Sequence, residues 1–399
     1  MILVFTTIYP SPDFELKNNT NVVHSFAKEW VKQGYDVTVI YLYPAFPQII
    51  HFFLRKFSAF FASITGKFIP SVYIDEVEEY SLDHVKVLRV PAFRLFPSSK
   101  YKNSELKKIT RIVEQYLEAH DLVPRIVIGH FHYPSIEFVV YFSKLYNAKS
   151  SIVVHGAARN LKRFYKDDYL SWIYKIDIWG FRSISIKKKF EFDFEPLSKS
   201  FICRSGVPDF FFGDDDLIMK KFNDKLNYLY VGSFIRRKHP LVVLKAIHKY
   251  IIFESFNLTY VGEGIEYASL KRYVTSYNLE KSVSFLFKKS RLEISNIMKN
   301  HQCFIMISSN ESFGLVYIEA MAAGCITVAS RNEGMDGIIV DGVNGFLCES
   351  NNENELIEIL RRINTLSLHD KIKISQNAVL TAKLYTDHKA SKEYIKNII

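Results

Sequence analysis

The stretch NESFGLVYIEAMAAG, residues 310–324, decides how the second half of the chain folds. An apolar run, CFIMISS (303–309), precedes it, and a second apolar run, CITVAS (325–330), follows it. This pattern predicts a strand, a helix over 315–323 and a second strand, the unit that joins parallel strands. Two glutamates frame the expected helix: Glu311 lies just before its start, and Glu319 lies in its second turn.

The same alternation of short apolar runs and helical patterns extends outward through the whole chain. Further strands are expected at 2–9, 36–43, 85–90, 125–131, 150–156, 226–234, 256–264 and 282–287. Helices are expected at 20–35, 104–120, 134–147, 239–251, 266–278 and 291–301. Strand–helix alternation with apolar strands indicates parallel βαβ units. The predicted fold class is therefore α/β, with two doubly wound Rossmann-like domains facing a central cleft, where such sheets bind ligands.

The length of 399 residues suits two or three domains. We expect a first domain over 1–205, a second over 206–380, and a C-terminal helix over 381–399 that can cross back to the first domain. The seam is placed in SGVPDFFFGDDD (205–216) because it combines glycine, proline and an acidic run. The three aspartates at 214–216 are interpreted as part of this linker and not as a metal-binding motif.

Composition indicates a soluble globular protein, with 48% hydrophobic and 24% charged residues. The four cysteines form no C-x-x-C pair, which fits a reducing compartment and argues against a disulfide framework or a zinc site. The start, MILVFTTIYPSP, lacks the charged leader of a signal peptide and is interpreted as a buried first strand. No run reaches about 18 uninterrupted apolar residues, so no transmembrane helix is expected. These features predict a cytoplasmic protein.

The net charge of +10 lies mostly in the first half of the chain. Residues 1–205 hold 28 Lys/Arg and 20 Asp/Glu, a difference of +8, whereas residues 206–399 hold 24 and 22, a difference of +2. A basic surface attracts nucleic acid, anionic lipid or phosphorylated substrates, although simple solubility explains it equally well. The phenylalanine-rich stretch 49–70 has Phe53, Phe57, Phe60 and Ile64 at helical spacing. It could lie in a membrane interface or pack on its own domain.

The chemistry of the opening stretch points to a substrate that carries hydroxyls and phosphates. Gly314 allows a close turn into the helix, whose unpaired N–H groups and positive dipole end suit a diphosphate. Carboxylates on either side can accept hydroxyl groups through charge-assisted hydrogen bonds. A nucleotide-sugar has this layout, with sugar hydroxyls, a diphosphate and ribose hydroxyls in sequence. The alternative is that Glu311 and Glu319 are ordinary carboxylates on a helix surface.

The E-x7-E spacing resembles that of the retaining nucleotide-sugar glycosyltransferases of family 4, which have the GT-B fold. Other family segments are matched in the expected order, and the likeness is strongest from about 226 to 350. They are VHGAARN (154–160), SGVPDFF (205–211), VGSFIRRKHP (231–240), VGEGIEYASL (261–270) and EGMDGIIVDGVNGFL (333–347). The resemblance implies a metal-independent enzyme with no cofactor beyond its nucleotide-sugar co-substrate.

The resemblance also implies three catalytic residues. Glu311 would contact the transferred sugar near its leaving-group face, and Lys238 would neutralise the departing diphosphate. His155 would lie near the sugar or the reacting centre. Cations placed in advance around the leaving group stabilise the transition state more than the ground state.

The donor would be held by further residues of the second half. Glu319 would hold the ribose, and the backbone amides of Phe313, Gly314 and Leu315 would meet the sugar or the diphosphate. Gly262 would shape the nucleotide pocket as a turn residue.

The chain departs from the family pattern in three places. Ser233 stands where the family commonly has an arginine, and Arg236 or Arg237 can replace it from further along the loop. Asparagines at 18, 19 and 21 stand near the usual paired glycines after the first strand. Phe287 stands where glycine is usual, so recognition of the base can differ.

His130 and His132, in GHFHYPS, either line the acceptor side or pack structurally. The predicted activity is transfer of a hexose-type sugar with retention, from a nucleoside-diphosphate sugar to a hydroxyl of a glycan or lipid-linked acceptor, in cell-surface polysaccharide synthesis. The expected partners are the donor, the acceptor and an anionic membrane surface on the inner face, with no nucleic acid. Two alternatives stay open: a nucleotide-sugar epimerase or hydrolase of the same fold, and a basic binding protein with a decayed sugar site.

Overall fold

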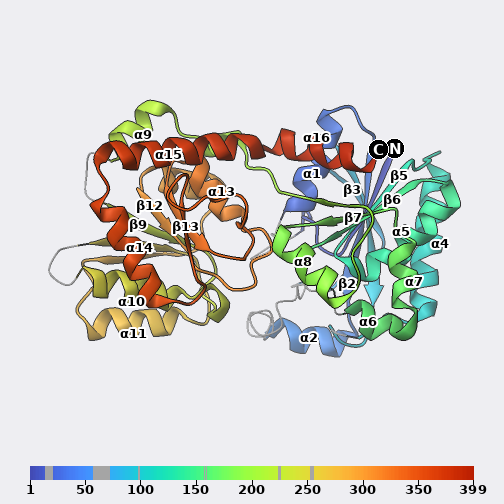
Figure 1. Ribbon diagram of the computed structural model, residues 1–399. Coiled ribbons are helices and arrows are strands. Elements are labelled where there is room, and N and C mark those ends of the chain that lie inside the picture. The colour runs from blue at the N-terminus through green and yellow to red at the C-terminus, as the bar shows by residue number, and fades with distance from the viewer. Residues whose placement is uncertain are drawn as a thin grey trace. The chain divides into compact units, whose positions relative to one another are not determined.

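The structure is a computed structural model in which two compact α/β units can be distinguished (Figure 1). It describes residues 1–13, 21–56, 72–97, 99–156, 158, 160–222, 226–251 and 256–399. The first unit comprises Met1–Arg182, Ile186–Arg204 and Ala390–Ile399, and the second comprises Ser183–Ser185 and Ser205–Lys389. Within the described ranges, no helix has both the length and the apolar character needed to cross a bilayer.

The first unit is built on an eight-stranded sheet of order β3-β4-β2-β1-β5-β6-β7-β8. Its strands are β1 (Ile2–Thr6), β2 (Val37–Ala45), β3 (Glu78–Leu82), β4 (Val85–Phe93), β5 (Ile126–His130), β6 (Lys149–Val154), β7 (Ile178–Phe181) and β8 (Ser200–Ile202). Its helices are α1 (Val22–Lys32), α2 (Gln48–Lys56), α4 (Asn103–Ala119), α5 (His132–Tyr146), α6 (Asn160–Tyr165), α7 (Tyr169–Tyr174) and α8 (Ile184–Asp193). The last helix, α16 (Asp387–Ile398), belongs to this unit from Ala390 onward.

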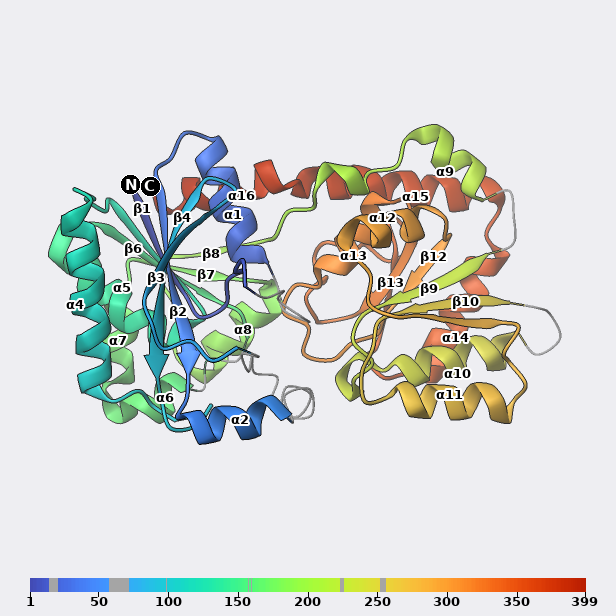
Figure 2. The ribbon, with the colours of Figure 1, turned by 180° about the vertical axis from the view of Figure 1, so that it is seen from behind.

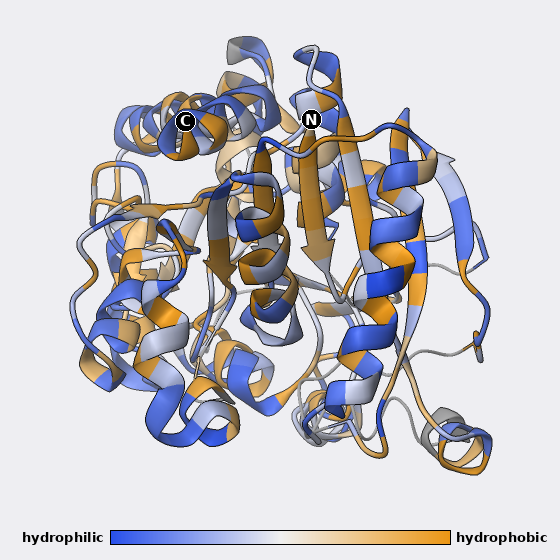
Figure 3. Cartoon of the chain, turned by 90° about the vertical axis from the view of Figure 1, so that its right-hand side faces the viewer, coloured by the Kyte–Doolittle hydropathy of each residue, from blue (hydrophilic) through white to orange (hydrophobic). Residues whose placement is uncertain are grey.

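Alternation along the strands gives this sheet two apolar faces, each covered by helices. Leu3 and Phe5 of β1 face a core that includes residues of α4 and α5, whereas Ile2 and Val4 face a core that includes residues of α1 and α16. A sheet buried on both faces requires near-continuous apolar strands, which is the pattern seen in the sequence. Figure 3 shows these apolar strands between helices that carry mixed polar and apolar surfaces.

The second unit has a fully parallel six-stranded sheet of order β11-β10-β9-β12-β13-β14. Its strands are β9 (Asn227–Val231), β10 (Asn257–Val261), β11 (Val283–Leu286), β12 (Cys303–Ile305), β13 (Ile326–Ser330) and β14 (Phe346–Cys348). Its helices are α9 (Asp215–Lys221), α10 (Pro240–Tyr250), α11 (Tyr267–Ser276), α12 (Arg291–Lys299), α13 (Leu315–Ala322), α14 (Glu353–Thr365) and α15 (Leu368–Ala382). Figures 1 and 2 show α12, α13 and α15 on one face of the sheet, and α10, α11 and α14 on the other.

The β3 strand was not predicted from the sequence: it pairs antiparallel with β4 through a tight turn in which Asp83 and His84 both have positive φ. The acidic run after Gly213 is not a linker: the Asp214 carboxylate accepts the Leu217 backbone N–H at 2.7 Å and caps α9. Ile218 of this helix is buried in the core of the second unit. The chain passes from the first unit to the second at Arg204–Ser205.

Each sheet has a point where the strand order reverses, and these points place the candidate sites. In the second unit the chain moves outward from β9 to β11 and then returns to add β12 on the other side of β9. The loops after β9 and β12 therefore leave neighbouring strands in opposite directions, which opens a crevice at their carboxyl ends. In the first unit the reversal lies between β1 and β5.

Candidate functional site

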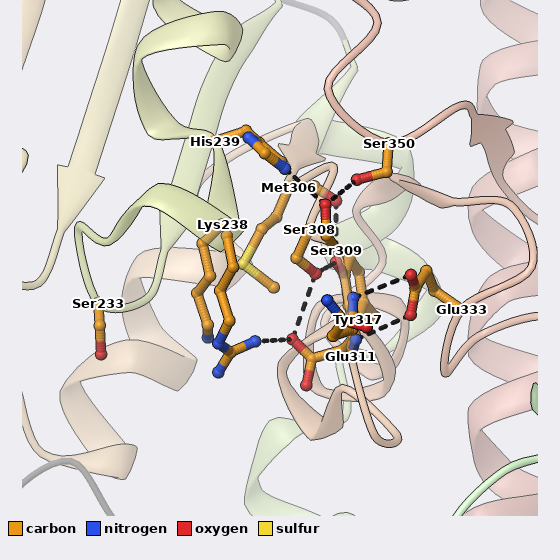
Figure 4. A network of polar contacts seen from close by, with 12 residues as sticks. Ser233, Lys238, His239, Met306, Ser308, Ser309, Glu311, Tyr317, Glu333 and Ser350 are labelled. Carbon is orange, nitrogen blue, oxygen red and sulfur yellow. Dashed lines mark hydrogen bonds and ion pairs between the residues drawn. The ribbon is translucent and has the colours of Figure 1, made fainter. Parts of the chain in front are cut away.

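The loops after β9 and β12 bring Lys238 and Glu311 into one network of polar contacts (Figure 4). The loop after β9 is tied to the loop after β12 by a hydrogen bond from the Ser309 backbone N–H to the Arg237 carbonyl, at 2.7 Å. The His239 ring and the Ser309 hydroxyl are 2.7 Å apart and add a side-chain link. The two predicted catalytic residues of this unit are therefore positioned by the same pair of loops.

Lys238 ends a short 3-10 helix, Arg236–Lys238, at the carboxyl end of β9. Its ammonium has no side-chain hydrogen bond or ion pair with any residue in the described part of the chain. Gly232 leaves room for this side chain, since a Cβ there would lie 3.3 Å from Nζ. Removal from water lowers the pKa of Lys238, while the negative charge of Glu311 opposes this shift and Arg237 adds to it. The lysine is thus a cation held ready without a protein anion bound to it.

Glu311 is a largely buried carboxylate, and two polar side chains in the described part of the chain contact it. The Ser308 hydroxyl donates to its Oε2 at 3.2 Å, and Nη1 of Arg237 lies 3.7 Å from the same oxygen. Ser308 is itself 2.8 Å from the Tyr317 hydroxyl, which donates to the Met306 carbonyl. The side chain of Glu311 is only 13% exposed. The alternative of an ordinary surface carboxylate therefore does not fit Glu311.

The loop that carries Glu311 is clamped by Glu333, a residue that sequence reasoning did not single out. Its two carboxylate oxygens accept the backbone N–H groups of Asn310 at 2.9 Å and of Glu311 at 2.8 Å. Such charge-assisted bonds to main-chain donors are strong and fix the backbone in place. Glu333 begins the EGMDG segment, which was recognised as a family loop, but nothing in the sequence indicated that its side chain faces residue 311.

Gly314 turns the chain into α13 in the way the sequence predicted. It caps the helix with φ +80, and no side chain caps it. A Cβ at this position would lie 2.4 Å from the Tyr317 ring and 3.2 Å from Cγ of Glu311. Phe313 is buried and Leu315 begins the helix. Glycine is therefore required here, and the entrance of the helix lies directly beside the Glu311 side chain.

Glu319, in the second turn of α13, is 7% exposed and pairs with Arg291. The Arg291 guanidinium donates through both Nε and Nη2 to Oε1 of Glu319. Arg291 is the first residue of α12, which begins with a capping box formed by Ser290 and Glu293. The capping box locates this helix start from sequence, but the pairing of Arg291 with Glu319 spans 28 positions and was missed.

The remaining predicted donor-binding residues differ in their placement. Gly262 has φ +140, and a Cβ there would lie 2.2 Å from the Gly232 carbonyl oxygen, so the turn after β10 packs directly on the loop after β9. Arg236 is exposed. Of the two arginines considered as replacements at Ser233, Arg237 is the one that contacts Glu311. Ser233 stands apart from the network in Figure 4.

The three predicted histidines belong to the first unit, at the carboxyl ends of β5 and β6. His130 ends β5, His132 begins α5, and His155 follows β6. Nδ1 of His130 lies 2.9 Å from Nε2 of His155. Burial lowers the pKa of His130 to about 3 and that of His132 to about 4, and it holds the pKa of His155 well below its usual range. All three rings are therefore neutral near pH 7.

The four cysteines are free and buried. Among the residues that the structure describes, no group of three or more His, Cys, Asp or Glu side chains is arranged to hold a metal ion. The asparagines at 18 and 19 and most of the stretch 49–70, namely 57–70, lie outside the described residues.

Comparison with known proteins supports the class that this fold and site define. Residues 215–378 match the family model described as Glycosyl transferases group 1. An uncharacterized glycosyltransferase of Methanocaldococcus jannaschii is 26% identical over 296 residues, covering 74% of this chain and 79% of that protein. Two solved structures each match with a TM-score of 0.69 over 99% of this chain. They are sucrose-phosphate synthase of Thermosynechococcus elongatus (16% identity, 97% of that chain) and Anabaena HepE in complex with UDP (14% identity, 98% of that chain).

The fold is that of the two-domain GT-B architecture, in which each domain is a Rossmann-like α/β unit. Its second unit matches the group 1 glycosyltransferases over residues 215–378, and the fold of the whole chain is that of GT-B glycosyltransferase structures. The predicted fold class and family are confirmed by these matches.

Proposed function

We propose that the protein is a retaining, metal-independent hexosyltransferase. It would move a sugar from a nucleoside-diphosphate sugar to a hydroxyl of a glycan or lipid-linked acceptor, in the synthesis of cell-surface polysaccharide at the cytoplasmic face of the membrane. The observation that carries the proposal is the Lys238 ammonium, which has no anionic partner within 4 Å in the described part of the chain and lies in the network that holds Glu311. An unneutralised, half-buried cation of this kind suits a ligand that brings its own negative charge.

The departing diphosphate gives Lys238 its chemical role. Negative charge grows on the phosphate oxygens as the glycosidic bond breaks, and a cation already in place needs no reorganisation at that moment. Arg237 is the second cation at this position, since its Nη1 lies 3.7 Å from Glu311. In this scheme the two basic side chains do the work that a metal ion does in other transferases.

Glu311 and the entrance of α13 would hold the sugar and the first phosphate. The carboxylate can accept sugar hydroxyl groups, and the first-turn N–H groups after Gly314 can donate to phosphate oxygens. In this proposal the acceptor hydroxyl attacks from the face the diphosphate leaves, a departing phosphate oxygen takes its proton, and the anomeric configuration is retained. An α-linked donor would then give an α-glycoside.

Glu319 keeps one oxygen for the ribose. Both Arg291 bonds go to Oε1, whereas Oε2 has no hydrogen-bond partner among the residues that the structure describes. A ribose hydroxyl donating to Oε2 would complete the hydrogen bonding of this carboxylate. HepE, which shares the fold, binds UDP, and this supports a nucleoside diphosphate as the leaving group here.

Two measurements test the proposal against its alternatives. A thermal-shift panel of UDP, GDP, ADP and their hexose conjugates should raise the unfolding midpoint for at least one nucleoside diphosphate. Mass spectrometry should then find an acceptor heavier by one hexosyl residue. A changed sugar on an unchanged nucleotide would identify an epimerase, and free hexose without a glycosylated product would identify a hydrolase. No midpoint shift with any donor would support the decayed binding protein.

The exposed apolar face of α2 favours contact with a membrane surface. Ile49, Phe52 and Phe53 follow helical i, i+3, i+4 spacing and are 80%, 71% and 65% exposed. The first half of the chain has a charge difference of +8, which attracts anionic lipid. A lipid-linked acceptor would be reached most readily by an enzyme bound to the surface that contains it.

Vesicle sedimentation tests this part of the proposal. The double variant F52S/F53S should bind vesicles of mixed neutral and anionic phospholipid about tenfold less than the unchanged protein. Phe192 lies in the last turn of α8 and is 90% exposed. The variant F192S is therefore the control, and it should bind vesicles as well as the unchanged protein does. Equal loss in both, or no loss in either, would contradict a specific role of α2.

A further inference from the structure

A chain of three side chains in the first unit runs from the C-terminal helix to the residue that follows β6. The Tyr394 hydroxyl of α16 lies 3.3 Å from Nε2 of His130, and Nδ1 of His130 lies 2.9 Å from Nε2 of His155. Tyr394 and His130 are 264 positions apart in the sequence. The fold therefore links the last helix of the chain to one of the predicted catalytic residues through a single intermediate ring.

The three rings are fixed by their surroundings. His130 is fully buried and Tyr394 is 1% exposed. Helix α16 is fastened to α1 by hydrogen bonds to Ser391: Trp30 Nε1 donates to its carbonyl at 3.0 Å, and Gln33 Nε2 donates to its hydroxyl at 2.7 Å. These packing and hydrogen-bond contacts hold the Tyr394 side chain beside His130.

A stacking contact on the face of the His155 ring also holds it in place. Phe131 stacks on it with 4.1 Å between ring centroids and an interplanar angle of 24°. Stacking fixes the plane of the imidazole, and the hydrogen bond from His130 fixes its rotation in that plane. The orientation of His155 is thus set by Phe131 and His130 together.

Both imidazoles are neutral, so each carries one proton and the chain of hydrogen bonds must run in one direction. Burial and, to a smaller extent, the nearby positive charge of Arg182 lower the pKa of His130 to about 3. Burial, His130 and Arg182 likewise lower the pKa of His155. In a neutral imidazole one nitrogen donates and the other accepts.

The Tyr394 phenol determines the direction in which the hydrogen bonds of this chain run. A phenol hydroxyl is a good donor, and the unprotonated nitrogen of an imidazole is a good acceptor, so the Tyr394 O–H donates to Nε2 of His130. The proton of His130 then lies on Nδ1 and is donated to Nε2 of His155. The proton of His155 is left on Nδ1. Fixing a tautomer through a bond to the other ring nitrogen is a known way in which outer groups control a functional histidine.

We propose that Tyr394 is a positioning residue that, through His130, holds His155 as the neutral tautomer protonated on Nδ1. In that form the ring nitrogen of His155 that does not face His130, Nδ1, is a hydrogen-bond donor and not a base. The catalytic consequence rests on the proposed function, with His155 in the role that the family resemblance implies for it, near the sugar or the reacting centre. The tautomer itself does not, because it follows from contacts within the first unit.

Nitrogen-15 NMR of the unchanged protein, labelled at histidine, tests the tautomer directly. Two-bond ring correlations should place the proton on Nδ1 in both His130 and His155, with the two signals assigned from the variants H130Q and H155A. A proton on Nε2 of His155, or rapid averaging between its two nitrogens, would overturn the proposal. This measurement needs no substrate and no activity.

The variant Y394F then separates a positioning role from a purely structural one. Loss of the hydroxyl should let His155 populate both tautomers and lower kcat roughly tenfold, with the KM for the donor unchanged. Y9F is the matched control, because it removes another buried hydroxyl bonded to a histidine, Nδ1 of His24 at 2.8 Å, with no contact to His155. Y9F should leave both the tautomer and kcat unchanged.

The outcomes distinguish this inference from the proposed function. A single Nδ1-protonated tautomer in Y394F, or equal loss of kcat in Y394F and Y9F, would overturn the role of Tyr394. By contrast, an H155A variant that folds and keeps full turnover would overturn the catalytic role of His155 in the proposed function, while the tautomer measured in the unchanged protein would still stand.

Discussion

The Glu333 carboxylate accepts the backbone N–H of Glu311 at 2.8 Å, so one glutamate fixes the main chain from which the other projects. Its second oxygen holds the neighbouring residue, Asn310, in the same way. The position of the Glu311 side chain therefore depends on a residue 22 positions later in the sequence.

This clamp predicts a loss of activity in E333Q. The amide can accept only one of the two N–H groups and turns a donor toward the other, so a hydrogen bond to a charged group, worth about 1.5–3 kcal/mol, is lost. We expect transfer to fall about 10- to 100-fold while the protein stays folded, measured by initial rates and circular dichroism. E358Q, at an exposed glutamate of α14 that pairs with Arg361, is the control and should keep full activity. Equal rates in E333Q and E358Q would rule out the clamp.

Removing the positive charge of Lys238 should greatly slow sugar transfer without unfolding the protein. K238M keeps most of the side-chain volume but cannot stabilise the leaving diphosphate, and we expect a loss of about a hundred- to a thousandfold in kcat. E311A should likewise lose transfer. Both rates are measured with the donor identified by thermal shift. Unchanged turnover in either folded variant would contradict the assignment of the site.

The lowered pKa of Lys238 predicts that the reaction slows on the alkaline side of the pH–rate profile. Only the protonated lysine can neutralise the departing phosphates, so kcat/KM should fall as pH rises through a pKa below the ordinary lysine value of 10.5. In K238R the guanidinium stays protonated over this range, and this alkaline decline should be absent from its residual activity. The same decline in both proteins would assign the titration to another group.

Replacing Gly314 by alanine should destabilise the protein through a steric clash. The same replacement at Gly342 measures the contribution of backbone strain alone. Gly314 and Gly342 have φ values of +80 and +74, so alanine strains the backbone at both by about 1–2 kcal/mol. Only at Gly314 would the new Cβ meet a ring at 2.4 Å, whereas at Gly342 the nearest atom is 3.5 Å away. G314A should therefore lose about 1–3 kcal/mol more than G342A and also lose transfer. Urea unfolding of the two variants checks this, and equal losses would contradict it.

The Arg291–Glu319 pair predicts a measurable coupling between two buried or half-buried side chains. R291M leaves the Glu319 carboxylate without its cation. The double variant R291M/E319Q should therefore lose less free energy of unfolding than the two single variants do in sum, by about 1 kcal/mol. The exposed pair Arg361–Glu358 is the control cycle, in which coupling should be about 0.3 kcal/mol or less. Urea unfolding of each cycle supplies the free energies. Equal coupling in the two cycles would show that burial adds nothing.

Much of the fold could be predicted because its signals are local. The helix α1 ends at Lys32, two residues before Gly34, which has φ +87, and each predicted strand has a counterpart near its expected place. The β3–β4 hairpin was missed because its turn, Asp83-His84, lacks the glycine that usually marks such a turn. The capping role of Asp214 was missed because an acidic run near glycine and proline has the composition of a linker.

The candidate site was predicted in part for the same reason. Glu311, Gly314 and Glu319 stand within one strand–helix unit, so their spacing indicated a candidate site, and the family resemblance implied the role of each residue. Arg237 could not be chosen over Arg236 from sequence, because the direction of each side chain depends on the 3-10 turn that contains both. The choice of Arg237 came only from its contact with Glu311.

By itself, the sequence determined the order of strands and helices, the glycine turn into α13 and the residue types available for binding a nucleotide-sugar. These follow from periodicity and local backbone preference, which act over a few residues. Only the tertiary structure decided that Glu333 clamps Glu311, that Arg291 neutralises Glu319 and that Tyr394 reaches His155 through His130. Each of these pairings joins residues distant in the chain, and it exists because the order of strands in a sheet brings their loops and helices together.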